Sequence, residues 1–297
     1  MANFGGSMVA IVTPMETGIS AECAIDWPNF DRFIEFHIAS GTDGIVAVGT
    51  TGESATLSEQ EHCEAIKYVV DRVAGRIPVI AGTGANSTSE AIRLTKCAKE
   101  AGADACLLVT PYYNKPTQQG LVLHHTAVAE AVAIPQILYN VPGRTACDMS
   151  VDTVCRLAEV PNIIGIKEAT GEVGRVKPLR DGCGDDFLLL SGDDLTGREF
   201  MLAGGDGVIS VTANVAPALM SKLCKFSISG QAEQAAEIDK KLALLHRDLF
   251  IQSNPIPVKW AVHKMGYCKA GARLPMTWLP EPDQIVVAEA MVTAGVL

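Results

Sequence analysis

The sequence predicts an α/β fold: a (β/α)8 barrel, also called a TIM barrel, with a C-terminal helical appendage. Short apolar segments and amphipathic segments alternate eight times before about residue 229. Eight such units in one chain favour a closed parallel barrel over an open sheet. An open dinucleotide-binding sheet normally has a G-x-G-x-x-G turn after its first strand, and no such turn is present there. We therefore expect residues 1–229 to form the barrel and residues 230–297 to form a helical region.

Eight apolar segments, bounded by glycine, proline or polar residues, are predicted as the barrel strands. They cover residues 8–12, 45–48, 79–81, 105–109, 136–140, 163–169, 187–191 and 207–210. A degenerate repeat at residues 41–46, 102–107 and 205–209 supports this assignment. In each copy a glycine ends a helix and a turn leads the chain into the next strand.

Capping signals predict where several helices begin. Asp26 stands two residues before a proline, as at a helix N-terminus. Ser58 with Glu61, and Ser87 with Glu90, have the spacing of capping boxes. Beyond residue 230 the pattern is helical only, with helices predicted over 231–250, 258–265 and 283–292.

Composition excludes several classes of protein. The 297 residues are 48% hydrophobic and 20% charged, with a formal net charge of -10 and no basic run. Nucleic acid is therefore not an expected partner, because phosphate neutralisation needs clustered lysine and arginine. The sequence shows no secretory signal and no apolar stretch long enough to span a membrane.

The nine cysteines are odd in number and scattered, without a CxxC motif. In a chain of this length that pattern is typical of reduced core thiols in a cytoplasmic protein. We expect a cytoplasmic location and no disulfide framework.

Neither a metal site nor a phosphate site is predicted. The histidines fall on predicted helices without the spacing of metal ligands; they are His37, His62, His124, His125, His246 and His263. The glycine-rich residues 204–207 precede the last strand, so they should lie at the end of the barrel opposite the usual phosphate site.

Lys167 is the residue around which a function can be argued. It lies in the predicted strand 163–169, which is otherwise largely apolar. Burial removes hydration from an ammonium and favours the neutral amine, which is the form that attacks a carbonyl carbon to make a Schiff base. The alternative is a strand-end lysine whose amine reaches solvent or pairs with an acid.

Other polar residues follow the strands, at the end where barrel enzymes carry their chemistry. Hydroxyl groups, a guanidinium and one amine are therefore expected to converge at one rim. The candidates are Thr50, Thr51, Tyr112, Tyr113, Tyr139, Arg144, Lys167, Gly192 and Ile209.

Three motifs resemble the pyruvate-dependent Schiff-base aldolases and synthases. They are Gly-Thr-Thr-Gly-Glu at 49–53, Tyr-Asn-Val-Pro-Gly-Arg-Thr at 139–145 and Gly-Ile-Lys-Glu-Ala at 165–169. The resemblance extends over essentially the whole chain, with the motifs in the same order and on the expected strands.

The resemblance implies a reaction without a cofactor or metal. Lys167 would form an imine with pyruvate, whose enamine would add to the aldehyde of L-aspartate 4-semialdehyde. The amine of that second substrate would then displace the lysine as the ring closes. This would be a lyase-class synthase at the first committed step of diaminopimelate and lysine biosynthesis.

The resemblance also implies roles for individual residues. Tyr139 would move protons, linked through Thr50 to Tyr113 of a neighbouring subunit. Thr51 would hold the pyruvate carboxylate, and Arg144 that of the semialdehyde. Two further residues, Gly192 and Ile209, would supply backbone carbonyls and shape beside the lysine.

A homotetramer, arranged as a dimer of dimers, and feedback inhibition by L-lysine are implied as well. The positions that would line the lysine site are Ser54, Ala55, His62, Asn86, Glu90 and Tyr112. Glu59 departs from the pattern of inhibited relatives, which often carry a basic or aromatic residue there, and a local acid would weaken inhibition.

Two alternatives remain at this point. A pyruvate lyase acting on a sialic acid or a deoxy sugar acid would share the lysine and tyrosine, but such relatives usually lack an arginine at the position of Arg144. A barrel that only binds a small molecule would lack Lys167 or Tyr139, and both are present.

Overall fold

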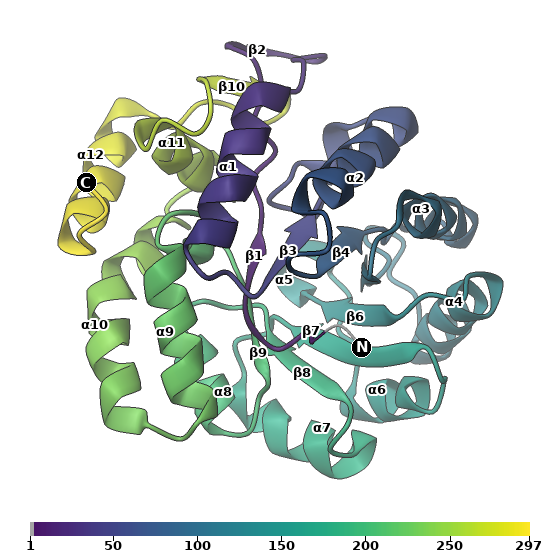
Figure 1. Ribbon diagram of the computed structural model, residues 1–297. Coiled ribbons are helices and arrows are strands. Elements are labelled where there is room, and N and C mark those ends of the chain that lie inside the picture. The colour runs from purple at the N-terminus through teal and green to yellow at the C-terminus, as the bar shows by residue number, and fades with distance from the viewer. Residues whose placement is uncertain (1–2) are drawn as a thin grey trace.

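The computed structural model describes residues 3–297 and contains a closed barrel of eight parallel strands (Figure 1). Each strand pairs with its neighbours in chain order, and the last strand pairs with the first. The (β/α)8 prediction is therefore confirmed. The strands are β1 (Gly6–Ala10), β3 (Gly44–Ala47), β4 (Val79–Gly82), β5 (Ala105–Val109), β6 (Gln136–Asn140), β7 (Ile163–Glu168), β8 (Leu188–Ser191) and β9 (Gly207–Ser210).

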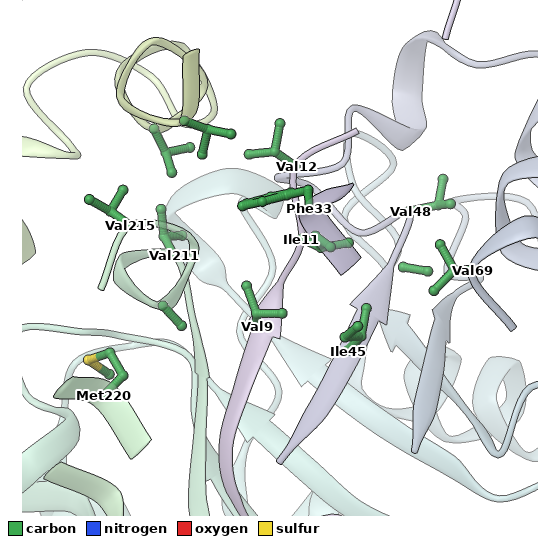
Figure 2. Packing of buried hydrophobic residues seen from close by; sticks show 14 of the residues in the cluster. Val9, Ile11, Val12, Phe33, Ile45, Val48, Val69, Val211, Val215 and Met220 are labelled. Carbon is green, nitrogen blue, oxygen red and sulfur yellow. The ribbon is translucent and has the colours of Figure 1, made fainter. Parts of the chain in front are cut away.

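Alternate strand residues belong to two different cores. In β3, Val46 packs with Ile80 and Ile137 in one cluster, which is the interior of the barrel. Its neighbours in the strand, such as Ile45, belong to the larger cluster between the strands and the surrounding helices. Because side chains alternate between the faces of a strand, this arrangement fixes which strand residues can reach the barrel mouth. Figure 2 shows part of the outer cluster around Phe33.

Helices surround the barrel, and the predicted N-termini at Asp26, Ser58 and Ser87 are confirmed, the first two with their capping hydrogen bonds. The Asp26 carboxylate accepts from the backbone N–H of Asn29 at 3.3 Å, and Ser58 and Glu61 form a capping box. The helices that follow the strands are α1 (Trp27–Ala39), α2 (Glu59–Val73), α3 (Thr88–Ala101), α4 (Gln118–Ala131), α6 (Val151–Ala158), α7 (Val176–Cys183), α8 (Gly197–Leu202) and α9 (Pro217–Ile228), with the short α5 (Pro142–Thr145) after β6.

The third predicted cap is wrong. Ser87 precedes α3 but makes no capping hydrogen bond, because its hydroxyl lies 3.1 Å from the hydroxyl of Ser89 instead. A nearby serine competes for the side chain, which the S-x-x-E spacing alone does not reveal.

The C-terminal region packs on the barrel and is not helical throughout. Its helices are α10 (Ala232–Asp248), α11 (Ile256–Lys264) and α12 (Glu281–Thr293), and α10 lies against α9 and α12 (Figure 1). The prediction of helix only is wrong, because β10 (Gly271–Arg273) pairs in parallel with β2 (Gly18–Ser20). Three residues are too few to show a strand period. A division of the chain at residue 230 stays a prediction.

One disulfide corrects the prediction that the cysteines are reduced. Cys63 of α2 is bonded to Cys97 of α3, and their Cα atoms lie 6.0 Å apart. Thirty-four residues separate the two in the sequence, so their pairing depends on how neighbouring helices pack and not on a local motif. The other seven cysteines are free.

All six histidines lie on helices, as predicted. Burial lowers the pKa of His37 and of His125 to about 3, from 6.5, and the neighbouring His124 adds to the effect at His125. Among residues 3–297 no cluster of three or more His, Cys, Asp and Glu side chains is arranged to hold a metal ion. No helix in the same range is long and apolar enough to cross a membrane.

His125 is expected to make the protein acid-sensitive. Between pH 6.5 and about 3 the unfolded chain binds a proton at this residue and the folded chain does not. The free energy of unfolding therefore falls as the pH drops through that window. Urea unfolding between pH 7.5 and 4.5 should show a shallower fall for His125→Leu than for the unchanged protein. Parallel curves would contradict this assignment.

Candidate active site

Two adjoining cavities lie at the C-terminal ends of the strands. The inner one, about 70 Å³, is lined by Tyr139 and Lys167, and the outer one, about 530 Å³, by Arg144. Five residues line both cavities: Thr50, Ser54, Gly84, Val109 and Asn254. The two cavities therefore adjoin at these shared residues, and Lys167 lines only the inner one.

Lys167 and Tyr139 stand side by side at the floor of the inner cavity. They are paired in register on β7 and β6, so both side chains face the same side of the sheet. The Lys167 Nζ atom lies 4.3 Å from the centroid of the Tyr139 ring. Both residues are buried, with 6% and 8% of their surface exposed. The face of the Tyr139 ring therefore lies within reach of a cation–π contact with the amine.

Glu168 follows the lysine and ties the ends of β6 and β7 together. Burial raises its pKa, while Arg175, Thr170 and Asn140 act in the opposite direction. The carboxylate lies 3.1 Å from Arg175 Nε and accepts from the backbone N–H of Thr170 at 2.9 Å. These contacts hold the strand end that carries Lys167.

Gly192 approaches the lysine closely. A Cβ atom added at Gly192 would lie 2.7 Å from the Lys167 Cε atom and 2.7 Å from the Ala169 Cβ atom. Real carbon contacts are longer than this, so only glycine leaves the lysine side chain in its observed position. Gly192 also lines the inner cavity.

Gly192→Ala should displace the amine and lower turnover by about 10²-fold, the effect typical of a misplacement near 1 Å. Gly174→Ala is the matched control, because an added Cβ there meets nothing within 4 Å. Steady-state rates of the two variants, with thermal unfolding to check the fold, test the expectation. Equal rates would contradict it.

The loop after β3 presents its two threonines differently. Thr51 is buried, with 2% of its surface exposed, and its hydroxyl accepts a hydrogen bond from Asn254 Nδ2 at 3.0 Å. Thr50 is partly exposed and lines both cavities. The Thr13 hydroxyl donates to the Gly52 carbonyl at 2.8 Å and holds the loop against the end of β1.

A buried ion pair fixes the far end of the same loop. Glu53 has a left-handed backbone, with φ of 59°, and its carboxylate pairs with the ammonium of Lys259 from α11. Both side chains are at most 2% exposed. The backbone N–H of Arg273 in β10 also donates to Glu53, at 3.3 Å. The C-terminal region therefore clamps the threonine loop.

Arg144 lies on α5 at the edge of the outer cavity. Its Nη2 atom is 3.4 Å from the backbone carbonyl oxygen of Asn254. This single bond leaves the rest of the guanidinium edge able to bind an anion.

The remaining predicted residues lie in different places. Ile209 is buried in the barrel interior. Tyr112 lines the outer cavity, whereas Tyr113 is 90% exposed, with φ of 72°. Tyr113 does not line either of the two cavities in this chain.

Five of the six residues predicted for a lysine site share the outer cavity. Ser54, Ala55, His62, Glu90 and Tyr112 line it, and Asn86 does not. The His62 Nε2 atom lies 2.7 Å from the carbonyl oxygen of Gly82, at the end of β4.

The carboxylate of Glu59 also lines this space but is paired with Arg93 at 2.7 Å. Both side chains of that pair are about half exposed. Glu59, the residue that differs from lysine-inhibited relatives, is therefore paired with a cation.

Sequence reasoning missed Asn254, which contacts both Thr51 and Arg144. It lies in the connection between α10 and α11, at some distance in sequence from any barrel strand. The only local signal is its position between Ser253 and a proline, which does not indicate a site.

The fold, with a buried lysine at the C-terminal ends of the strands, is that of a class of protein: the (β/α)8 barrel lyases that act through a Schiff base. The chain matches the model of the Dihydrodipicolinate synthetase family over residues 3–293, and it belongs to that family.

The comparisons cover the chain from end to end. It is 62% identical over 293 residues to a 4-hydroxy-tetrahydrodipicolinate synthase of Thioalkalivibrio sulfidiphilus, with 99% of this chain and 98% of the relative covered. A crystal structure of the chloride-inhibited dihydrodipicolinate synthase from Acinetobacter baumannii, complexed with pyruvate, is 55% identical, with a TM-score of 0.96 and coverage of 99% and 100%. A crystal structure of the dihydrodipicolinate synthase from Cyanidioschyzon merolae with lysine bound is 37% identical to this chain, with a TM-score of 0.95 and coverage of 100% of both chains.

These relatives confirm the predicted family, the predicted fold and the predicted synthase function. Their names support the condensing synthase and not the alternative, a lyase of sialic or sugar acids.

Proposed function

We propose that this chain condenses pyruvate with L-aspartate 4-semialdehyde to give 4-hydroxy-tetrahydrodipicolinate, with Lys167 as the nucleophile. The observation that carries the proposal is the position of Lys167, which is buried in the barrel mouth with its amine 4.3 Å from the Tyr139 ring centroid. No cofactor takes part, because the imine itself serves as the electron sink.

The steps balance within the two substrates. The Lys167 amine adds to the ketone of pyruvate, and loss of water leaves an imine. Removal of a methyl proton gives the enamine, whose carbon attacks the aldehyde of the second substrate, and the aldehyde oxygen takes up a proton. The amino group of the second substrate then attacks the imine carbon, so the ring closes and the Lys167 amine leaves.

Tyr139 would move these protons, and the proximity of its ring to the Lys167 amine supports this role. Thr50, at the entrance of both cavities, would connect it to the tyrosine of a neighbouring subunit. Tyr113 is suited to that part, since it projects into solvent with 90% of its surface exposed. The proposal therefore requires an oligomer, for which the family suggests a homotetramer.

The two carboxylates of the substrates have separate binding groups. Thr51 and the backbone of its loop would hold the pyruvate carboxylate beside Lys167, where Gly192 leaves room. Arg144 would hold the carboxylate of the semialdehyde from the outer cavity, since a guanidinium binds carboxylates with two parallel hydrogen bonds.

Initial rates with pyruvate and a panel of aldehydes test the function. We expect turnover with L-aspartate 4-semialdehyde and little with N-acetylmannosamine or with sugar-acid aldehydes. Arg144→Lys should raise KM for the semialdehyde much more than KM for pyruvate. Faster turnover of a sugar aldehyde than of the semialdehyde would overturn the proposal.

The outer cavity favours L-lysine as an effector of the same enzyme. Glu90 and Tyr112 line it together with His62, and the Glu90 carboxylate suits an ammonium group. The Glu59–Arg93 pair offsets the repulsion expected from Glu59. Initial rates should fall with millimolar L-lysine and change less in Glu90→Gln. Unchanged rates, together with no binding heat in calorimetry, would contradict an effector role.

Sedimentation velocity tests the shared tyrosine. A fully active monomer would remove Tyr113 from the proton path, whereas a loss of activity in Tyr113→Phe with the oligomer intact would support it.

A further inference from the structure

We propose that Asn254 recognises the amino group of the second substrate, by accepting a hydrogen bond from it at Oδ1. This inference rests on the proposed function and names a specificity-determining residue for the same site.

Two observations, together with the structure of the second substrate, put Asn254 beside its amino group. It is one of the residues that line both cavities. Its backbone oxygen holds Arg144 at 3.4 Å, so a carboxylate bound by Arg144 lies next to this residue. In aspartate 4-semialdehyde the amino group is attached to the carbon that bears the carboxylate, which brings the amine to Asn254 as well.

The side chain of Asn254 has a free acceptor. Its Nδ2 atom donates to Thr51 Oγ1 at 3.0 Å, whereas Oδ1 is buried and has no hydrogen-bond partner among residues 3–297. The residue is 94% buried, since 6% of its surface is exposed. An unpaired buried acceptor is unfavourable, and a charged N–H donor is the partner that compensates it best.

Two of the carboxylates that line the outer cavity are already engaged by cations. Glu53 is paired with Lys259, and Glu59 with Arg93. An asparagine also suits the chemistry, because a neutral acceptor binds an ammonium without repelling the adjacent carboxylate.

The test uses 4-oxobutanoate, which is aspartate 4-semialdehyde without its amino group. Because 4-oxobutanoate has no amine to displace Lys167, its reaction stops at the enzyme-bound adduct. The ratio compared is therefore that of the second-order rate constants with which the two aldehydes consume the pyruvate-loaded enzyme in a single turnover, and it isolates the contribution of the amino group to binding and addition. Asn254→Leu should lower the ratio by roughly 10- to 100-fold, the value of a hydrogen bond to a charged group. Asn254→Asp, which retains an acceptor, should keep most of it.

Two controls accompany these variants. Gln252→Leu removes an exposed amide from the same segment and should leave both rates unchanged. Thr51→Val removes the partner of Nδ2, and it should raise KM for pyruvate while leaving the ratio between the aldehydes unaltered.

Borohydride trapping of pyruvate on Lys167 separates the possible failures. If Asn254→Leu still traps pyruvate but loses the same factor for both aldehydes, Asn254 only positions Thr51 and Arg144, and the inference is wrong. If the unchanged protein does not turn over L-aspartate 4-semialdehyde, the proposed function itself fails.

Discussion

Replacing Lys167 should abolish turnover and the covalent adduct with pyruvate together. Lys167→Met is close in shape but has no amine, and Lys167→Arg retains a positive charge but forms no imine with a ketone. Both should lower kcat by on the order of 10⁴-fold or more, as removal of a nucleophile does in other covalent enzymes. The shared result would separate the nucleophile from a merely electrostatic role for this charge.

The measurement is reduction with borohydride in the presence of pyruvate, followed by peptide mapping. In the unchanged protein the adduct should fall on the peptide that contains Lys167. Lys222→Met, which alters an exposed lysine of α9, controls for non-specific modification and should retain full activity. An adduct on another lysine, or turnover by Lys167→Met, would refute the mechanism.

Removing one partner of the Glu53–Lys259 pair should destabilise the protein strongly. In Lys259→Met the Glu53 carboxylate would remain in a site where both side chains are at most 2% exposed. An unpaired charge of this kind costs about 3–5 kcal/mol in the free energy of unfolding. Because Glu53 ends the loop that carries Thr50 and Thr51, KM for pyruvate should rise as well.

The double variant makes this prediction sharper. Glu53→Met with Lys259→Met replaces both charges by apolar groups of similar length, so it should recover much of the stability that Lys259→Met loses. Lys177→Met breaks the exposed Lys177–Asp181 pair, whose side chains are 81% and 62% exposed, and it should change stability little. The measurement is urea unfolding of the unchanged protein, Lys259→Met, the double variant and Lys177→Met. Equal losses in the single and double variants would show that shape, and not charge, matters at this position.

The barrel and its lysine could be predicted because their signals are local. The apolar segment around Lys167 is recognisable from its own residues, and it forms the six-residue strand β7. The order of the strands then puts Lys167 beside Tyr139. Most strand limits agree within two residues, because glycine and polar residues stop the apolar segments.

The parts that could not be predicted depend on segments distant in sequence. Asn254 reaches Thr51 across 203 positions, and Cys63 meets Cys97 only because α2 and α3 pack together. Gly192 was selected by resemblance, but its physical reason, the 2.7 Å approach of the Lys167 Cε atom, appears only in three dimensions. Local propensity carries no information about any of these contacts.

The clamp on the threonine loop also sets an order of events during protein synthesis. Lys259 and Arg273 leave the ribosome after the whole barrel, whose last strand ends at Ser210. At about 5–20 residues per second, that interval lasts several seconds. All eight barrel strands and Lys167 are therefore synthesised before the residues that hold the threonine loop. The contacts that hold the threonine loop can form only after the C-terminal segment has been translated.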